Sequence, residues 1–348
     1  MPIASEYRWP AEWEPQSATW IAWPHNRITW PNHFDPIPAV FARFIAELSR
    51  VQAVEVLAGP IGTSPAADEM LRELSGDTSN ITIHQEPTND VWIRDYGPTF
   101  VHCLSDGGLV GVDWRFNAWG GKYLPCDFDA AAAATICRII QCRRLASPIV
   151  CEGGGLETDG RGTLLTTSSV LLSHTRNPDM ARCGVEDELR RVLGVTKILW
   201  VDGGGLEGDD TDGHIDQLAR FVSPGVVVAA VSSSPSDSNH AGLKANYEML
   251  IKANDAHGQR LTVHQLPTPL PRFVDGRRVP ESYCNFLIAN GIVIVPTFRS
   301  PTDDQALRLL EQLIPDRRII PLDAFDLIWG LGAFHCASQQ QPAALQTS

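Results

Sequence analysis

Cys336 lies in the segment whose residue types most favour covalent chemistry. It follows His335, and Ser338 and the run Gln339–Gln341 come shortly after it. A thiol becomes a useful nucleophile only as its thiolate, which needs a polar, partly open pocket with a cation or an imidazole nearby. These polar side chains would be poorly placed in a simple core strand. They favour a reactive cysteine over the commoner alternative, a small buried hydrophobe.

Two other segments combine carboxylates with further reactive groups. Residues 89–99 carry two acids, an arginine and aromatic residues before a Gly-Pro turn, and residues 208–216 place four aspartates around His214. In an extended backbone, residues two apart project from the same face, so His214 and Asp216 are predicted to enter one pocket. Together with Cys336 they provide a nucleophile, a proton carrier and anions, and no basic residue is needed in the pocket.

Six blocks of sequence, taken together, resemble the agmatine deiminase and bacterial peptidylarginine deiminase family. They occupy residues 13–15 with 19–26, 92–100, 116–121, 152–154, 213–216 and 335–342. The resemblance therefore covers nearly the whole chain. It implies a guanidine-modifying hydrolase of the pentein fold, an α/β propeller in which five ββαβ-like modules surround a central active site.

The resemblance also implies roles for particular residues. Asp95 and Asp216 match the carboxylates that bind the guanidinium group, a planar fork of N–H donors suited to carboxylate oxygens. Glu152 matches the third acid of the site, expected to hold His214 or the reacting nitrogens. Cys336 matches the nucleophile, and His214 is the group that moves protons.

The expected reaction needs neither a metal nor an organic cofactor. The thiolate attacks the guanidinium carbon, His214 protonates the departing ammonia, and water then displaces the sulfur from a thiouronium intermediate. With agmatine as substrate the products are N-carbamoylputrescine and ammonia. Trp92 either fills the core or lies along the aliphatic stem of the substrate.

Departures from the family pattern leave the substrate's tail open. Leu331, Ala333 and Phe334 stand in the final turn where the family more often has small or polar residues, and Asp212 replaces a frequent asparagine before His214. Agmatine, arginine, a peptidyl arginine and other alkylguanidines all remain candidates.

Acidic residues near His214 favour an amine at the end of that tail. An ammonium group taken from water needs a paired charge or hydrogen-bond acceptors. Glu207, Asp209 and Asp210 are the nearest candidates in the sequence, and Asp210 is predicted to bind the substrate. Agmatine is therefore expected to be a better substrate than arginine.

Three other interpretations of these residues lead to different classes of protein. His214 and Asp216, with a distant His264 or His335, have the composition of a two-histidine, one-carboxylate iron site, which would make a metal-dependent oxygenase. A calcium loop of the EF-hand type fails because it would require an acid at Gly208 and a glutamate at position 219. A non-enzymatic acidic module that binds polyamines is the third alternative. None of these explains Cys336.

Composition sets broader limits on partners and location. The 348 residues carry a net charge of −13, which argues against nucleic-acid binding and is compatible with a cationic substrate. The eight cysteines show no Cys-x-x-Cys pair and suit a reducing compartment. The sequence shows neither a signal-peptide pattern nor an apolar run long enough to span a membrane. We expect a cytoplasmic protein that acts on a small cationic guanidine, with a homodimer as its candidate assembly.

Short apolar strands are predicted to alternate with helices in one domain, residues 1–348. The predicted strands are Val54–Ala58, Leu164–Thr167, Val226–Ala230 and Ile292–Pro296. The predicted helices are Ala39–Leu48, Ala130–Ile140, Asp187–Leu193, Ala241–Ala253 and Asp303–Leu313. Gly153–Glu157 recurs as Gly203–Glu207, which is compatible with a radial repeat or simply with tight turns.

Overall fold

The computed structural model describes residues 5–59, 63–75 and 77–345 and shows a mixed α/β fold. The helices are α1 (Ile37–Ser49), α2 (Thr63–Ser75), α3 (Ile93–Tyr96), α4 (Ala118–Gly121), α5 (Asp127–Ile139), α6 (Ser168–Leu171), α7 (Arg182–Leu193), α8 (His240–Leu250) and α9 (Asp303–Leu313). Four short 3₁₀ segments in these residues are η1 (Gly153–Gly155), η2 (Ile215–Gln217), η3 (Tyr283–Asn285) and η4 (Leu327–Gly330).

The strands of this described part form five sheets of three or four strands and one two-stranded ribbon. In spatial order, the sheets are β19 (Ser338–Pro342), β2 (Gln16–Ala22), β3 (Ala53–Leu57), β4 (Ile81–His84); β1 (Tyr7–Arg8), β5 (Thr99–Cys103), β6 (Leu109–Arg115), β7 (Arg143–Val150); β10 (Lys197–Trp200), β9 (Thr163–Thr166), β8 (Leu156–Thr158); β11 (Ala219–Ser223), β12 (Val226–Val231), β13 (Thr262–Pro267); and β16 (Leu287–Ala289), β17 (Ile292–Thr297), β18 (Arg318–Asp323). The ribbon is β14 (Phe273–Val274) with β15 (Arg277–Arg278).

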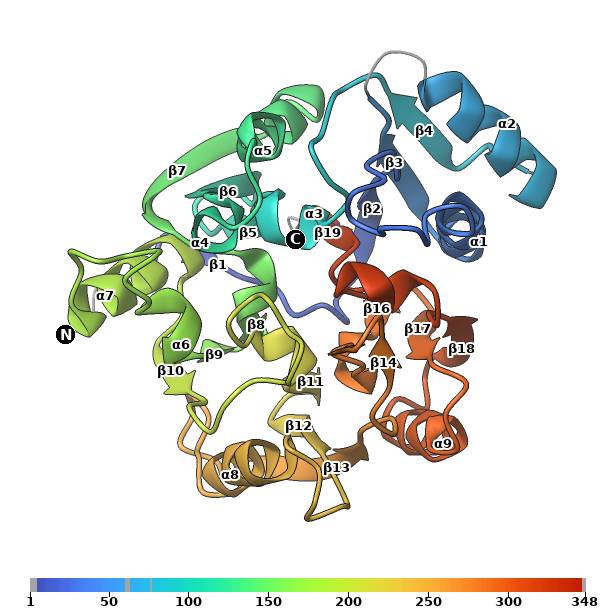
Figure 1. Ribbon diagram of the computed structural model, residues 1–348. Coiled ribbons are helices and arrows are strands. Elements are labelled where there is room, and N and C mark those ends of the chain that lie inside the picture. Colours follow the sequence, from blue (N-terminus) through green and yellow to red (C-terminus); the bar gives the residue numbers. More distant parts are fainter. Residues whose placement is uncertain (1–4, 60–62, 76, 346–348) are drawn as a thin grey trace.

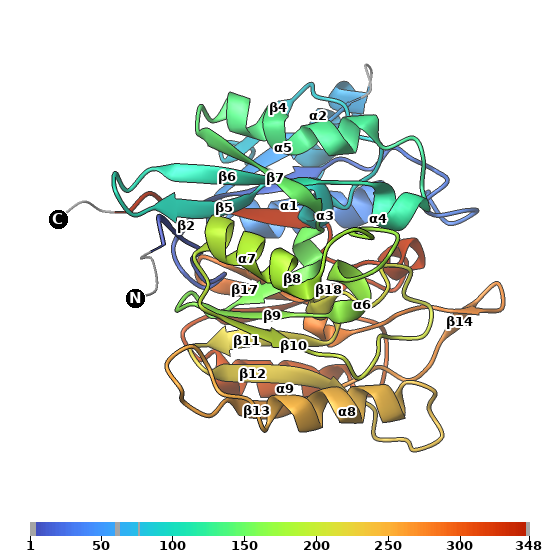
Figure 2. The ribbon, with the colours of Figure 1, turned by 90° about the vertical axis from the view of Figure 1, so that its left-hand side faces the viewer.

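Each of the five sheets combines an antiparallel pair with a parallel pair. β5 and β6 are antiparallel, for example, whereas β6 and β7 are parallel. Parallel neighbours need a crossover connection, and α1, α5, α7, α8 and α9 provide it in the five sheets. Figure 1 shows the sheets arranged around the middle of the molecule with these helices outside, and Figure 2 gives the side view.

Burial of consecutive apolar residues explains why these segments form strands. Ile292–Val295 in β17 is buried at every position, as expected for a strand covered on both faces. All four predicted strands and all five predicted helices are confirmed, with ends that differ by a few residues. None of the helices described is long and apolar enough to cross a membrane.

The two glycine-rich repeats differ in structure. Gly153–Gly155 forms η1 and leads into β8, where Glu157 is buried against Arg220. The second copy, Gly203–Glu207, contains no strand, and Glu207 is exposed. The repeated Gly-Gly-Gly-Leu-Glu sequence therefore forms two different local structures.

Candidate active site

The five predicted catalytic residues meet in the middle of the fold. Asp95 lies on α3, Glu152 and His214 immediately precede η1 and η2, Asp216 lies on η2, and Cys336 follows η4. Glu152, His214 and Asp216 are 0% exposed, Asp95 is 3% exposed and Cys336 is 4% exposed. Short helical segments and the turns beside them thus bring together residues that are far apart in the sequence.

Gly154 shows how tightly three of these side chains converge. A Cβ atom at this position would stand 2.7 Å from both Asp95 Oδ1 and His214 Nδ1, and 3.1 Å from Asp216 Oδ2. Real Cβ atoms essentially never approach other heavy atoms to less than 3.0 Å. The Glu-Gly-Gly turn therefore needs glycine here because the site occupies the space of a side chain.

His214 lies between two carboxylates. Its Nδ1 is 3.5 Å from Asp95 Oδ1, and its Nε2 is 3.8 Å from Glu152 Oε2. Burial lowers the pKa of His214, but the charges of Asp95 and Glu152 outweigh it and raise the pKa to about 9. Neither ring nitrogen has a hydrogen-bond partner among the described residues, so a protonated imidazole can turn its donors toward a substrate.

Two hydrogen-bond donors hold the carboxylate of Asp95, whose Oδ1 also faces His214. The indole Nε1–H of Trp119 donates to Oδ2 and the backbone N–H of Gly154 donates to Oδ1, both at 2.9 Å. Burial dominates over these bonds and raises the pKa of Asp95 to about 6. The carboxylate is therefore ionised at neutral pH and loses its charge in mild acid.

The environment of Glu152 contradicts the expectation that the pocket needs no basic residue. Arg176, itself buried, donates from Nε to both carboxylate oxygens of Glu152 at 2.8 and 3.0 Å. Burial alone would raise the pKa of Glu152, but His214 and Arg176 together hold it below its usual value. Arg176 also pairs with Asp212 at 2.7 Å, although the Asp212 side chain is 38% exposed.

The surroundings of Cys336 correct the expectation of a partly open, thiolate-stabilising pocket. Burial, together with the negative charges of Asp216 and Asp95, raises the pKa of the Cys336 thiol well above its usual value. Its Sγ accepts a hydrogen bond from Asn285 Nδ2 at 3.0 Å and donates one to Asp216 Oδ2 at 3.5 Å. Without a bound cationic ligand to offset these carboxylates, Cys336 is therefore a thiol.

The polar residues after Cys336 do form a buried strand, contrary to the expectation that they would be poorly placed in one. This strand is β19, which pairs with β2 and buries Ser338, Gln339 and Gln340. Gln340 Oε1 accepts a hydrogen bond from Arg94, and Gln341 Oε1 accepts one from the indole of Trp20 at 2.9 Å. These glutamines satisfy buried donors, which is why a strand can carry them.

A buried chain of charges supports Asp216. His335 contacts Asp216 Oδ2 with Nδ1 at 2.7 Å and Glu12 Oε2 with Nε2 at 2.9 Å. Glu12 in turn pairs with Arg220 at 2.7 Å. The pKa of Asp216 is lowered because the bond and charge of His335 outweigh the effect of burial. Asp216 Oδ1 has no partner in the described structure and is available to a ligand.

His214 and Asp216 do not share a face through strand alternation, as the spacing predicts. His214 has φ of −56° and ψ of 137°, and Ile215–Gln217 is a 3₁₀ helix, so the prediction from an extended backbone is wrong. Gly154 nevertheless lies next to both of them.

The histidines also do not assemble the alternative iron site. Both ring nitrogens of His335 contact carboxylates, and His264 lies on the outer strand β13. The described residues contain no group of three His, Cys, Asp or Glu side chains placed to hold a metal.

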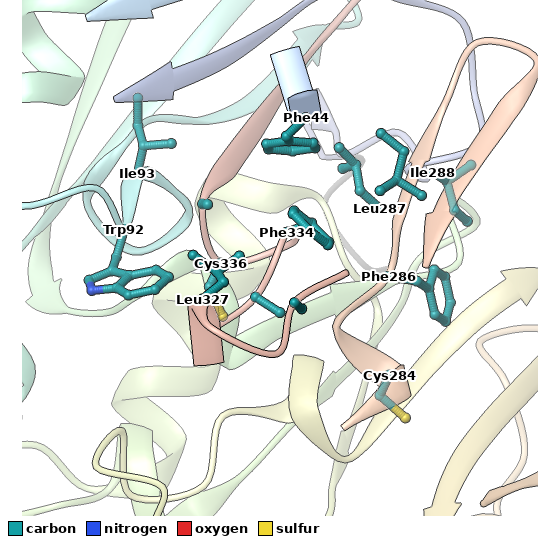
Figure 3. Close-up of a cluster of buried hydrophobic side chains, with 14 of the residues drawn as sticks. Phe44, Trp92, Ile93, Cys284, Phe286, Leu287, Ile288, Leu327, Phe334 and Cys336 are labelled. Carbon is teal, nitrogen blue, oxygen red and sulfur yellow. The ribbon is translucent and has the colours of Figure 1, made fainter. Parts of the chain in front are cut away.

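Trp92 lies next to Cys336. A Cβ atom at Gly332 would be 2.6 Å from the Trp92 ring and 3.1 Å from the Cβ of Cys336, so the two side chains flank this glycine. Figure 3 shows the indole extending toward the Cys336 segment, while Phe334 points the other way, toward Phe44. The bulk of Phe334 thus enters the core and does not narrow the site.

The acidic loop before His214 divides into different environments. Asp209 bonds to Thr211 and the backbone of Gly213, and Glu207 binds Ser238 and Arg278. Asp210 accepts a hydrogen bond from the hydroxyl of Tyr123, and burial raises its pKa.

Asp90 interacts electrostatically with Asp210. The sequence alone did not indicate a role for Asp90. Burial raises the pKa of Asp90 to about 7, and the charge of Asp210 contributes to that rise. Thr29 donates to its Oδ2 at 2.8 Å. A buried carboxylate whose pKa is raised further by a neighbouring carboxylate indicates a region suited to a cation.

Asn285 is the other residue that sequence reasoning missed. Its Oδ1 accepts the backbone N–H groups of Ala333 and Cys336, both at 3.2 Å, while its Nδ2 contacts the Cys336 sulfur. The only available signal was a single amide side chain inside the apolar run Tyr283–Leu287.

Comparison with known proteins identifies the family. The sequence profile of the Porphyromonas-type peptidyl-arginine deiminase family matches residues 8–342. The chain belongs to this family. An agmatine deiminase from Stutzerimonas stutzeri is 37% identical over 365 residues, covering 98% of this chain and 97% of the relative. One from Pseudomonas syringae pv. tomato is 36% identical, with 98% and 97% covered.

Solved structures agree with the family assignment. The agmatine deiminase of Enterococcus faecalis superposes with a TM-score of 0.89 at 32% identity, covering 98% of both chains. An amidinotransferase from Microseira wollei superposes with a TM-score of 0.53 at 12% identity, covering 98% of this chain and 99% of that one, which shows a shared fold alone. The mixed α/β pentein fold expected from the sequence is thereby confirmed.

Proposed function

We propose that this protein is a hydrolase that converts agmatine and water to N-carbamoylputrescine and ammonia. The observation that carries the proposal is the convergence of a buried thiol, Cys336, and a buried imidazole, His214, with the carboxylates of Asp95, Asp216 and Glu152. Such a site favours a cation with an electrophilic carbon. The names of the full-length relatives support agmatine as that cation.

Substrate binding is proposed to activate the nucleophile. Asp95 and Asp216 bind the edges of the guanidinium group, whose positive charge then offsets theirs. Since those same carboxylates help to keep Cys336 protonated, their neutralisation lowers the pKa of the thiol, which releases its proton to solvent. Asn285 stabilises the thiolate through its N–H donor.

The chemical steps use His214 first as an acid and then as a base. The Cys336 thiolate attacks the guanidinium carbon, and the imidazolium gives its proton to one amino group, which leaves as ammonia. The remaining thiouronium is attacked by water, whose proton goes to the now neutral His214. Collapse of that adduct breaks the carbon–sulfur bond, forms the ureido carbonyl and restores the thiol.

The fold supports a five-module propeller around this centre. Five sheets repeat one pairing pattern and one crossover helix, and the site residues come from segments between them. A hydrophobic core running from Trp20 to Ala337 supports a single domain. The eight described cysteines are all free, which supports the proposed cytoplasmic location. A homodimer remains the proposed assembly.

A substrate panel tests the proposed function. Ammonia and ureido product are measured with agmatine, arginine, a peptidyl arginine and a simple alkylguanidine. Agmatine is expected to have the highest kcat/KM because Asp90 and Asp210 offer anions to an ammonium tail. Preference for either arginine substrate would assign a different deiminase activity. Failure to release ammonia from any guanidine would refute the proposal.

Asp210→Asn is expected to weaken agmatine binding more than it slows the chemistry. Removal of one charged partner of the ammonium should raise KM about tenfold or more, with kcat changed much less. Glu207→Gln is the matched control, since Glu207 is bound to Ser238 and Arg278 and should leave both constants unchanged. An unchanged KM with a collapsed kcat for Asp210→Asn would show that this loop does not bind the amine.

The pH profile of kcat/KM is expected to be bell-shaped. Below about pH 6 Asp95 gains a proton and loses its attraction for the guanidinium, and above about pH 9 His214 loses the proton that ammonia requires. Trp119→Phe removes a donor that stabilises the Asp95 carboxylate, so the acidic limb should move to higher pH. The alkaline limb should stay in place. Movement of both limbs by the same amount would contradict these assignments.

A further inference from the structure

The turn at the end of α5 holds two cysteines in a defined geometry. The backbone N–H of Cys142 donates to the carbonyl of Cys137 at 3.0 Å, and the N–H of Gln141 donates to that of Arg138 at 3.3 Å. Gln141 is left-handed, with φ of 54°. These two nested bonds and the left-handed residue define a Schellman motif, in which Cys137 and Cys142 occupy the two positions whose side chains characteristically touch.

The two thiols are neighbours in this structure. Cys137 and Cys142 interact strongly enough to shift each other's pKa in opposite directions. Gly111 on β6 lies so close to the Cys137 sulfur that a Cβ atom there would stand 2.4 Å from it. The motif and this packing thus hold the two thiols next to each other without help from a ligand.

The two cysteines differ in access and acidity. Cys137 is buried, whereas Cys142 is partly exposed and lines a surface cleft that also contains Arg143 and Gln341. The neighbouring Cys137 thiol lowers the pKa of Cys142 despite the opposing effect of burial, and the same interaction raises the pKa of Cys137. Cys142 is consequently the thiol that ionises first and meets solutes.

We propose that Cys137 and Cys142 form a redox-active dithiol that small-molecule disulfides, such as glutathione disulfide, oxidise to an intramolecular disulfide. The Cys142 thiolate attacks one sulfur of the reagent, forms a mixed disulfide and expels one glutathione thiolate. Cys137 then loses its proton to solvent and attacks Cys142 Sγ, which expels the second glutathione. Each cysteine loses one electron and the reagent gains two, so that two glutathione thiols are produced.

The other cysteines define the expected selectivity. Cys336 is buried and its pKa is raised, so a bulky anionic disulfide should reach it slowly in the absence of substrate. Cys183 is exposed on α7, but exposure alone does not supply a resolving thiol. Cys183 is thus expected to stop at a glutathione adduct, whereas Cys142 proceeds to the disulfide.

The test maps the bonds in the full-length protein. The protein is incubated with glutathione disulfide, unreacted thiols are alkylated, and tryptic peptides are analysed without reduction. Cleavage after Arg138 separates the two cysteines, so their disulfide joins peptides 123–138 and 139–143. Because the first peptide also contains Cys126, the experiment is repeated with Cys126→Ser. The linked pair should persist in that variant and disappear on treatment with a dithiol reductant.

Two further variants make the result decisive. Cys142→Ser changes a partly exposed side chain and should abolish the linked peptides, whereas Cys183→Ser should leave their yield unchanged. At partial oxidation the linked pair should exceed the glutathione adduct on Cys183 by about tenfold. A stable glutathione adduct on Cys142, loss of the linkage in Cys126→Ser, or earlier modification of Cys336 would each overturn the proposal.

Discussion

Cys336→Ala is expected to reduce guanidine hydrolysis by at least about 10⁴-fold, since removal of a covalent nucleophile eliminates the reaction path itself. The Cys336 sulfur has Asn285 Nδ2 at 3.0 Å and Asp216 Oδ2 at 3.5 Å, and no second thiol touches these groups in the described structure. Cys336→Ser should be almost as inactive, because a serine hydroxyl stays protonated where even a thiol has a raised pKa. Steady-state ammonia release measures both losses.

The matched control for the nucleophile is Cys284→Ala. Cys284 is also fully buried, and Figure 3 shows its sulfur pointing away from Cys336. This variant should retain turnover, and thermal unfolding of all three variants separates chemical loss from misfolding. Near-normal hydrolysis by a folded Cys336→Ala protein would refute the covalent mechanism.

His214→Gln is expected to lower kcat by about 10²- to 10⁴-fold, the usual contribution of a positioned general acid and base. The imidazole lies 3.5 Å from Asp95 and 3.8 Å from Glu152, and these charges keep it protonated at neutral pH. An amide can occupy similar space but cannot deliver the proton that converts an amino group into ammonia. Single-turnover kinetics should place the loss in the chemical step.

His264→Gln distinguishes this mechanism from the iron-site alternative. His264 lies on the outer strand β13, so deiminase activity should be unaffected by its loss. An oxygenase that used His264 as a ligand would lose metal and activity together. Equal losses in the His214 and His264 variants would therefore contradict the assignment of His214 alone.

The sequence was sufficient to predict which residues lie together where those residues belong to short motifs. Asp95, His214 and Cys336 each lie in a block with a Gly turn or a polar run, and the structure brings all three together. Their partners could not be found in this way. Asn285 reaches Cys336 from a segment 51 residues away, and Arg176 reaches Glu152 from 24 residues away, with no local pattern to mark either contact.

Two predictions from local sequence, for the glutamines after Cys336 and for the orientation of Asp216, were wrong because tertiary contacts override local polarity and periodicity. The glutamines after Cys336 looked unsuited to a core strand, yet Arg94 and Trp20 provide the donors that they need inside one. A 3₁₀ turn, rather than strand alternation, orients Asp216, and His335 fixes its carboxylate. Residues distant in the sequence thus determine both the burial of the glutamines and the orientation of Asp216.

The pairing of β19 with β2 also has a consequence for biosynthesis. β2 begins at Gln16, but the strand that covers its edge ends at Pro342, so this early segment leaves the ribosome long before its neighbour exists. Contacts of such long sequence separation form late in folding. Cys336 immediately precedes that final strand, and its surrounding amide and carboxylates are already synthesised when it appears. A nascent chain that stops before Cys336 therefore carries the acids without the proposed nucleophile, and the proposed covalent site can form only after its last segment has been synthesised.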